Sequence, residues 1–522
     1  MIREQIKKLL GDAEAEILRP EDSAFGDYST NAALKLAKKE RKNPRELAET
    51  MAADLQRQSS RIFERIEAAG PGFINFFLSK DFLRKQVAEI IERGANYGAL
   101  DFGQGKKISI DFISANPTGP VHVGNARGGP LGDVLGNVFE KAGYEVSREY
   151  YVNDAGNQVD VLGHSILGDE QAQYSGDYID DLRKNISAVE PRQAGEAGVK
   201  LILEKIIKPS MAKFSIGFDN WISEKELLAS GQVDGIINLL KEKKYVYEKD
   251  GAWWFRATDF GDDKDRVVIK SSGEKTYFGS DIASHRLRIE QGAQRLIDIW
   301  GADHYGDVKR IKGALEASGF KDCLDIVLTQ FVKVIKQGQE MKMSKRAGTY
   351  VSVDDLIDEA GKDATRFFFL MYSPEAHMIF DLDLAREQSE KNPVYYVQYA
   401  FARISSLFEK LKTQSANQQV SFNLSSDAQS LNLLNHQAEL DLIKQLIRLP
   451  ELVADTAKDY QVHRLPRYAL DLVRSFHKFY EECRVISEDK DLTEARLALV
   501  LATKVVLKNT LDLMGISAPE KM

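Results

Sequence analysis

Residues 106–152 read KKISIDFISANPTGPVHVGNARGGPLGDVLGNVFEKAGYEVSREYYV, and this stretch decides the fold class. A β-branched run opens it, and a turn rich in proline and glycine follows. Apolar residues then recur at steps of three and four over 131–142, which predicts an amphipathic helix with Gly143 as its C-terminal cap. A second β-branched run closes the stretch. Such a strand–helix–strand unit places its two strands side by side in a parallel sheet.

A second unit of the same kind lies further along the chain. The run RLIDIWG, 295–301, predicts a buried strand, helical spacing continues over 305–315, and LDIVLTQF, 324–331, predicts the next strand. Residues from about 155 to 290 separate the two units and mix helical and strand patterns. We therefore predict an α/β fold in which a split parallel sheet carries a large insertion.

Two further domains flank this sheet. Residues 1–104 combine helical spacing at the N-terminus with a short aromatic run, GPGFINFFLS, which predicts a small α/β domain. From 376 to 522 the amphipathic pattern is helical throughout, and Pro450 and Pro466 mark points where helices break or begin. This pattern predicts an all-α helical bundle at the C-terminus. The central domain is thus predicted to occupy 105–375.

Composition limits the class of protein. The 522 residues are 43% hydrophobic and 29% charged, which is ordinary for a globular protein. No apolar run reaches the ~18 residues of a membrane span, and the N-terminus lacks the apolar core of a secretory signal. We therefore expect a cytoplasmic protein without membrane contact. Cys323 and Cys483 are far apart and have no CxxC partner, so neither a disulfide framework nor a zinc site is expected. The net charge of −8 does not indicate a polyanionic partner, although a local basic face would still bind one.

The turn rich in proline and glycine is the first candidate site. Gly119 and Gly124 have the separation of a phosphate-binding P-loop, but Asn125 replaces the lysine that this loop needs. What remains is the N-terminus of a helix, whose free N–H groups and dipole suit a phosphate. His122 stands at the helix entry, and two roles stay open for it: donation to a phosphoryl group that gains charge, or capping of the helix.

The second candidate site is the polar loop QGQEMKMSKRAGTYV, 337–351, which follows a predicted strand. Lys342 and Lys345 are three residues apart, and Ser344 lies between them. Two ammonium groups at this spacing can neutralise the charge that grows on pyrophosphate as it leaves a triphosphate. A solvated charged loop without a ligand is the alternative, and for the loop taken alone it is the simpler one.

The two motifs together resemble the paired signatures of the class I aminoacyl-tRNA synthetases, HIGH and KMSKS, here HVGN and KMSKR. The surrounding stretches SANPTGPVHVGN, REYYVNDAGNQV, LIDIWGADHYGDVKRIKGAL and YYVQYAFARI resemble the arginyl-tRNA synthetases of the bacterial type. The similarity covers essentially the whole chain. It implies a Rossmann-type catalytic domain, an N-terminal additional tRNA-binding domain and a C-terminal helical anticodon-binding domain. The implied reaction activates L-arginine with ATP and then transfers it to the 3′ end of tRNA(Arg).

The resemblance also implies roles at the ATP end of the site. The implied ATP-binding residues are His122, Gly124, Asn125, Gly301, Asp303, Met343, Ser344 and Lys345. The implied catalytic residues are His122, Asn125, Lys342 and Lys345. A carboxylate at Asp303 would accept hydrogen bonds from the ribose hydroxyls, although an aspartate that caps a helix stays an alternative. Asn125 stands where the HIGH pattern has its second histidine, and its amide can still donate a hydrogen bond.

The implied arginine-binding residues are Asn116, Glu224, Tyr277 and Asp281. A guanidinium group is a flat cation with five donors, so its pocket needs carboxylates and a flat or hydroxyl-bearing wall. Glu224 and Asp281 supply the first, and Tyr277 the second. Asn116 would bind the α-amino or carboxylate end of the substrate. For Asp281 the alternative is an N-cap of the helix that begins IASHRL.

The implied partners are tRNA(Arg), L-arginine and ATP with Mg²⁺, and arginine activation is expected to require bound tRNA. We expect a monomer. Three rivals stay open at this point: a class I synthetase for glutamate or glutamine, a paralogue that binds tRNA without catalysis, and a free-standing nucleotidyltransferase. A glutamate pocket would need a cation instead of two carboxylates, and a nucleotidyltransferase would not need the C-terminal helices.

Overall fold

The computed structural model describes residues 1–59, 61–341, 351–418 and 428–522. Its centre is a five-stranded sheet in the order β12-β11-β5-β6-β7, and every neighbouring pair is parallel. The strands are β5 (Lys107–Phe112), β6 (Glu145–Val152), β7 (Asn220–Ser223), β11 (Arg295–Gly301) and β12 (Leu324–Thr329). β5 lies in the middle and is buried along nearly its whole length, as expected of a central parallel strand. The predicted α/β fold and four of the five strands are confirmed.

The helix after β5 is divided into α5 (Val123–Ala126) and α6 (Gly128–Lys141). Gly143 has a φ of 88°, its N–H donates to the Glu140 carbonyl at 3.0 Å, and the Tyr144 N–H donates to the Phe139 carbonyl at 3.0 Å. This is a Schellman motif, and the Phe139 and Tyr144 rings pack against each other with their centroids 5.4 Å apart. The glycine cap predicted from the sequence is therefore confirmed.

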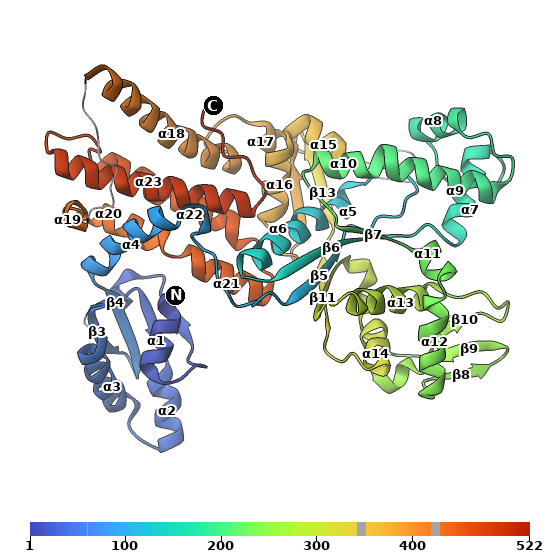
Figure 1. The fold of residues 1–522 in the computed structure, drawn as a ribbon, viewed down its shortest axis with the longest axis horizontal. Coiled ribbons are helices and arrows are strands. Elements are labelled where there is room, and N and C mark those ends of the chain that lie inside the picture. Colours follow the sequence, from blue (N-terminus) through green and yellow to red (C-terminus); the bar gives the residue numbers. More distant parts are fainter. Residues whose placement is uncertain (60, 342–350, 419–427) are drawn as a thin grey trace.

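The region predicted as an insertion contains two parts, separated by β7, which the sequence did not reveal as a strand of the main sheet. β7 has only four residues, and its burial does not alternate clearly between two faces. The first part is helical: α7 (Asn157–Leu167), α8 (Asp177–Asn185), α9 (Pro191–Ile202), a π-helical turn (Leu203–Ile207) and α10 (Lys208–Lys213). The second part contains α11 (Glu224–Ala229), α12 (Gln232–Glu242), β8 (Val246–Lys249), β9 (Ala252–Phe255), β10 (Arg266–Ile269) and α13 (Tyr277–Glu290). Figure 1 shows the two parts at the same end of the molecule, opposite the N-terminal domain.

The chain then leads from the sheet into the C-terminal bundle. This connection comprises α14 (Val308–Ser318), β13 (Val332–Lys336), β14 (Gln339–Glu340), α15 (Val353–Ala360), α16 (Lys362–Leu370) and β15 (Met378–Asp381). β15 pairs in parallel with β13, so the segment from 376 onward begins with a strand, unlike the helical prediction. In β15 only Met378 and Phe380 are buried. Two buried residues are too few to distinguish a strand from the start of a helix in the sequence.

The remainder of the C-terminal segment is helical, as predicted. Its helices are α17 (Leu382–Arg386), α18 (Pro393–Gln418), α19 (Ala428–Leu431), α20 (Gln437–Leu446), α21 (Leu449–Asp459), α22 (Arg464–Glu482) and α23 (Lys490–Leu513). Pro450 and Pro466 both lie in the first turn of a helix, where the missing N–H costs nothing. Within the described part of the chain, no helix is both long and apolar enough to cross a membrane.

The N-terminal domain has an antiparallel sheet in the order β1-β2-β4-β3, and the predicted aromatic strand is β4. Its elements are α1 (Ile2–Leu10), β1 (Ile17–Leu18), β2 (Tyr28–Thr30), α2 (Ala32–Glu40), α3 (Pro44–Ser59), β3 (Phe63–Ala69), β4 (Phe73–Leu78) and α4 (Lys80–Arg93). A buried carboxylate on α21 joins this domain to the bundle, because Glu451 accepts from Arg19 Nε at 3.1 Å and from the Tyr28 hydroxyl at 3.1 Å. The N-terminal domain is thus docked on the C-terminal helices (Figure 1). Its last helix, α4, packs against α20 and α23 of the bundle.

Candidate active site

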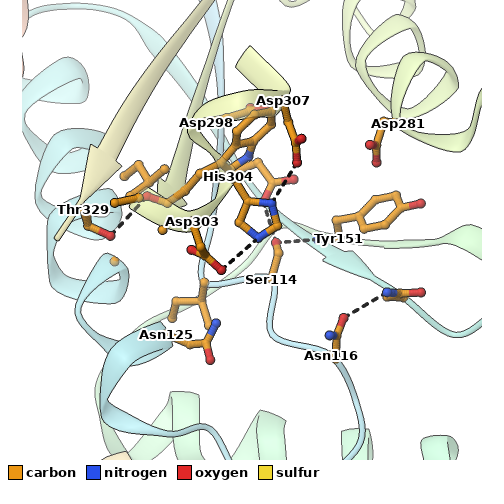
Figure 2. A pocket seen from close by; sticks show the side chains of 18 of the residues that line it. Ser114, Asn116, Asn125, Tyr151, Asp281, Asp298, Asp303, His304, Asp307 and Thr329 are labelled. Atoms are coloured by element: carbon orange, nitrogen blue, oxygen red, sulfur yellow. Dashed lines mark hydrogen bonds and ion pairs between the residues drawn. The ribbon is translucent and has the colours of Figure 1, made fainter. Parts of the chain in front are cut away.

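A cavity of about 560 Å³ opens at the carboxyl ends of β5, β6, β11 and β12. The sheet order reverses direction between β5 and β11, and open α/β sheets bind ligands at such a point. Eight of the residues predicted from sequence line this one cavity: Asn116, His122, Gly124, Asn125, Tyr277, Asp281, Gly301 and Asp303. Figure 2 shows Asn116 and Asn125, from the turn after β5, on one side of the cavity and Asp281 and Asp303 on the other.

The chain turns sharply where β5 ends. Ile113 and Ser114 have positive φ angles of 68° and 35°, which residues with a Cβ rarely adopt. Hydrogen bonds to β6 hold this conformation, since Ser114 Oγ accepts from the Tyr151 N–H at 2.9 Å and the Tyr150 hydroxyl donates to the Ala115 carbonyl at 2.8 Å. The strained turn therefore aims the following residues into the cavity.

His122 caps α5. Its Nδ1 accepts from the Gly124 N–H at 3.0 Å and from the Asn125 N–H at 3.4 Å, so the capping role left open by the sequence is confirmed. The sequence predicted that free N–H groups at this helix N-terminus would bind a phosphate. The N–H groups of Gly124 and Asn125 are instead bonded to the His122 ring, which corrects that expectation. A Cβ at Gly124 would lie 2.9 Å from the His122 ring, so glycine permits the cap. An accepting Nδ1 places the proton of the neutral ring on Nε2.

The turn that carries His122 also holds the segment that follows the predicted KMSKR loop. The Val123 N–H donates to the Val351 carbonyl at 3.1 Å, and the Val353 N–H donates to the Val121 carbonyl at 2.9 Å. These bonds tie the end of the loop to the histidine turn. Lys342, Met343, Ser344 and Lys345 themselves lie outside the described residues.

Gly301 and Asp303 lie where β11 ends. A Cβ at Gly301 would stand 2.3 Å from Asp303 Oδ1, so a larger residue here would force this carboxylate to move. Asp303 is not the N-cap of the short 3-10 helix that follows (Ala302–Asp307), because Gly301 occupies that position. Its side chain is 65% exposed, and its second oxygen lies 3.8 Å from His304 Nε2. The carboxylate is thus available to hydroxyl donors at the mouth of the cavity (Figure 2).

Tyr277 and Asp281 lie one turn apart on α13. The helix begins at Tyr277 after Thr276, so Asp281 belongs to its second turn and the N-cap alternative is wrong. Burial raises the pKa of Asp281 to about 6, and the charges of His285 and Arg310 oppose that rise. Glu224, at the start of α11, is 4% exposed. Burial raises its pKa to about 7, and the Asp281 carboxylate adds to the rise. The Asp281 carboxylate therefore acts on Glu224, although Glu224 does not line the cavity itself.

Several buried acceptors around these carboxyl groups have no hydrogen-bond partner among the described residues. They are Glu224 Oε2, Asn153 Oδ1, Gln158 Oε1 and the Tyr151 hydroxyl oxygen. Buried polar atoms are nearly always satisfied, because an unpaired one costs about 1–3 kcal/mol. A group of acceptors of this kind beside two carboxyl groups suits a ligand that is rich in donors and positively charged.

Sequence reasoning missed three of these residues, namely Tyr151, Asn153 and Gln158. All three lie in the stretch REYYVNDAGNQV, which directly follows the strand next to the His122 turn. Their position at the carboxyl end of β6 was the signal that could have identified them. Asn153 also holds a predicted residue in place, since its Nδ2 donates to Asn116 Oδ1 at 2.9 Å.

Three family models match the chain. Residues 1–78 match the arginyl-tRNA synthetase N-terminal domain. Residues 86–197 and 183–369 match the catalytic domain of the class I (R) tRNA synthetases. Residues 397–522 match the DALR anticodon binding domain.

Curated relatives are similar over nearly their full length. An arginine–tRNA ligase of Carboxydothermus hydrogenoformans is 43% identical over 538 residues, which cover 98% of this chain and 95% of the relative. An arginine–tRNA ligase of Caldanaerobacter subterraneus subsp. tengcongensis is 44% identical over 534 residues, which cover 98% and 94%. The arginyl-tRNA synthetase structure of Thermus thermophilus has a TM-score of 0.76 at 22% identity, over 99% of this chain and 98% of that one, and shares the fold.

Proposed function

The chain belongs to the class I arginyl-tRNA synthetases, and from this premise we propose how its cavity activates L-arginine. The protein is an arginine–tRNA ligase, which uses ATP, L-arginine and tRNA(Arg) as substrates. ATP and arginine form arginyl-adenylate and pyrophosphate. The tRNA 3′-terminal hydroxyl then attacks the activated carbonyl, and AMP leaves.

We propose that the guanidinium group of arginine lies between Asp281 and Tyr277, with Glu224, which is buried next to the cavity, as the second carboxyl group of the site. The group of unpaired acceptors beside the two carboxyl groups carries this proposal, because a guanidinium offers five donors and one positive charge. Asn116 would bind the opposite end of the amino acid. A glutamate side chain would bring a further negative charge to these carboxylates, so the arrangement disfavours glutamate.

ATP would lie across the His122 turn and the end of β11. The Asp303 carboxylate would accept from the ribose hydroxyls, with Gly301 leaving room for it, and Gly124 and Asn125 would contact adenosine and phosphate. The Nε2–H of His122 would donate to the phosphate that gains charge when the arginine carboxylate attacks the α-phosphorus. Mg²⁺ would accompany ATP, bound mainly through its phosphates. Positioning and charge stabilisation then suffice, without a covalent enzyme intermediate.

We propose that the KMSKR loop closes on pyrophosphate, with Met343 and Ser344 at the nucleotide and Lys342 and Lys345 as the neutralising charges. The hydrogen bonds between the His122 turn and residues 351–353 support this, because they hold one end of the loop beside the cavity. A monomeric state, a cytoplasmic location and the absence of zinc stay predictions from the sequence.

Lys345→Ala is expected to slow arginine activation by about 100-fold or more, on the order of 2–4 kcal/mol, because one donor to the departing pyrophosphate is lost. The measurement is single-turnover formation of arginyl-adenylate with saturating substrates. Lys333→Ala, which removes an exposed ion pair with Glu340 on the preceding hairpin, is the control. A near-normal rate for Lys345→Ala would contradict the proposed role of Lys345 in neutralising the departing pyrophosphate.

The function itself is tested by ATP–pyrophosphate exchange with each of the protein amino acids, with and without total tRNA. The expected result is exchange confined to arginine and dependent on tRNA. Exchange with glutamate or glutamine, or no exchange under any condition, would contradict the proposal.

A further inference from the structure

A chain of buried charges lies beneath the proposed guanidinium site. One turn after Asp281, the side chain of His285 is 5% exposed and makes two short hydrogen bonds. Its Nδ1 lies 2.6 Å from the Asp281 carbonyl oxygen, and its Nε2 lies 2.6 Å from Asp298 Oδ2 on β11. Asp298 in turn accepts from Arg288 Nη1 at 2.7 Å. The mechanism proposed above gives none of these three side chains a role.

The geometry determines the charge of His285. A carbonyl oxygen only accepts hydrogen bonds, so Nδ1 must carry a proton to bond to the Asp281 carbonyl. Asp298 is paired with Arg288, which keeps its carboxylate ionised and therefore also an acceptor, so Nε2 must carry a proton as well. With a proton on each nitrogen, His285 is an imidazolium ion. Burial alone would lower its pKa, but the Asp298 carboxylate outweighs burial and raises it.

Several other charged groups act on this ion or on the side chains next to it. They are Asp281 and Arg288 on α13, Asp298 on β11, Asp111 on β5, Glu149 on β6, Glu224 on α11, Asp307 at the end of the 3-10 helix and Arg310 on α14. Carboxyl groups outnumber the cations, so a proton is favoured on some of these carboxyl groups. Asp111 shows the effect, because burial and the nearby Asp298 raise its pKa to about 7.

We propose that His285 is a positioning residue for arginine recognition: its imidazolium, held between the Asp281 carbonyl and Asp298, fixes this turn of α13 and keeps the Asp281 carboxylate ionised for the guanidinium group. The inference rests on the proposed arginine site. It adds that His285 supplies a positive charge inside the site before the substrate arrives. Without this charge, the neighbouring carboxyl groups of Asp281 and Glu224 would favour protonation.

The sign of the effect follows from the acid equilibrium. The guanidinium binds the ionised form of Asp281, so affinity for arginine falls as the pH falls through the pKa of that group. In the wild-type protein that pKa is about 6. Loss of the neighbouring positive charge moves it upward, so a neutral side chain at position 285 weakens arginine binding most at low pH and least at high pH.

His285→Gln tests this, because the amide can still donate a hydrogen bond but carries no charge. In aminoacylation assays with tRNA(Arg), its KM for arginine is expected to rise about 3-fold relative to wild type at pH 6.5 and to stay near the wild-type value at pH 8.5, since a rise of about one pKa unit from about 6 lowers the ionised fraction of Asp281 about 3-fold at the lower pH and hardly at the higher. The KM for ATP is expected to stay within about 2-fold at both pH values. An increase that is equal at both pH values, or shared by ATP, would contradict the proposal.

Two further variants make the test independent of folding. His285→Lys keeps a positive charge and is expected to hold the arginine KM near the wild-type value at pH 6.5; a large increase there, in a protein with normal ATP KM, would overturn the proposal. Arg286→Gln is the matched control, since Arg286 is on the same helix but pairs with Glu290 at 2.7 Å. If the proposed function itself fails, the wild-type protein shows no arginine-dependent reaction, which distinguishes that failure from failure of this inference.

Discussion

Asp281→Asn is expected to raise the KM for L-arginine by about 100-fold or more, while the KM for ATP stays within about 2-fold. Asparagine has the shape of aspartate but no charge, and breaking one buried charge pair costs on the order of 2–5 kcal/mol. Asp281 is half-buried at the cavity wall, so solvent compensates only part of the loss. Steady-state aminoacylation with varied arginine measures the effect.

The same site predicts a pH dependence in the wild-type protein. Burial raises the pKa of Asp281 to about 6 and that of Glu224 to about 7, so the arginine KM is expected to rise as the pH falls from 8 to 6.

Asp234→Asn is the control for the Asp281→Asn substitution, because it removes only an exposed ion pair with Lys275 at 2.6 Å. An unchanged arginine KM in Asp281→Asn would show that the pocket lies elsewhere.

His122→Asn is expected to slow adenylate formation by about 100- to 1,000-fold without a loss of stability. Asparagine is among the best residues for capping a helix N-terminus, so it can replace the Nδ1 cap that His122 provides to α5. It cannot reproduce a ring N–H on the far side, and one lost donor to a developing charge costs about 3–4 kcal/mol. The substitution therefore separates the two roles that the sequence left open.

Single-turnover adenylate formation and thermal unfolding measure the two roles of His122 separately. His122→Ala is the comparison, since it loses the cap as well and is expected to lower the unfolding temperature in addition to the rate. His164→Asn, on α7 where the ring nitrogen Nδ1 lies 2.7 Å from Asp169, is the control for histidine loss. A wild-type rate of adenylate formation in His122→Asn would show that His122 only caps the helix.

The sequence predicted those features that depend on neighbours along the chain. The β-branched run before the His122 turn, the helical spacing after it and the cap at Gly143 are all local patterns, and each has its counterpart in the structure. The catalytic motifs were also recognisable because their chemistry requires given residue types at fixed spacing. These local features were sufficient for the fold class, and the resemblance to the arginyl-tRNA synthetases identified eight of the cavity residues.

Other features depend on contacts between distant segments, and the sequence did not reveal them. β7 and β15 are too short for a periodic pattern and exist because the sheets provide partners for them. The unpaired oxygens of Asn153 and Gln158 become informative only when the fold buries them beside Asp281. The charge of His285 depends likewise on Asp298, which is thirteen residues further along the chain.

Competition by L-citrulline tests the arginine pocket most directly. Citrulline has the length and shape of arginine, but a carbonyl oxygen replaces one nitrogen of the guanidinium and the positive charge is lost. A site of carboxylates and unpaired acceptors should reject it by about 10,000-fold relative to arginine, as sites built around a polar group reject analogues that lack it. The measurement is inhibition of arginine-dependent aminoacylation by citrulline at pH 8. Inhibition at concentrations within about tenfold of the arginine KM would contradict the account, because the pocket would then not recognise charge.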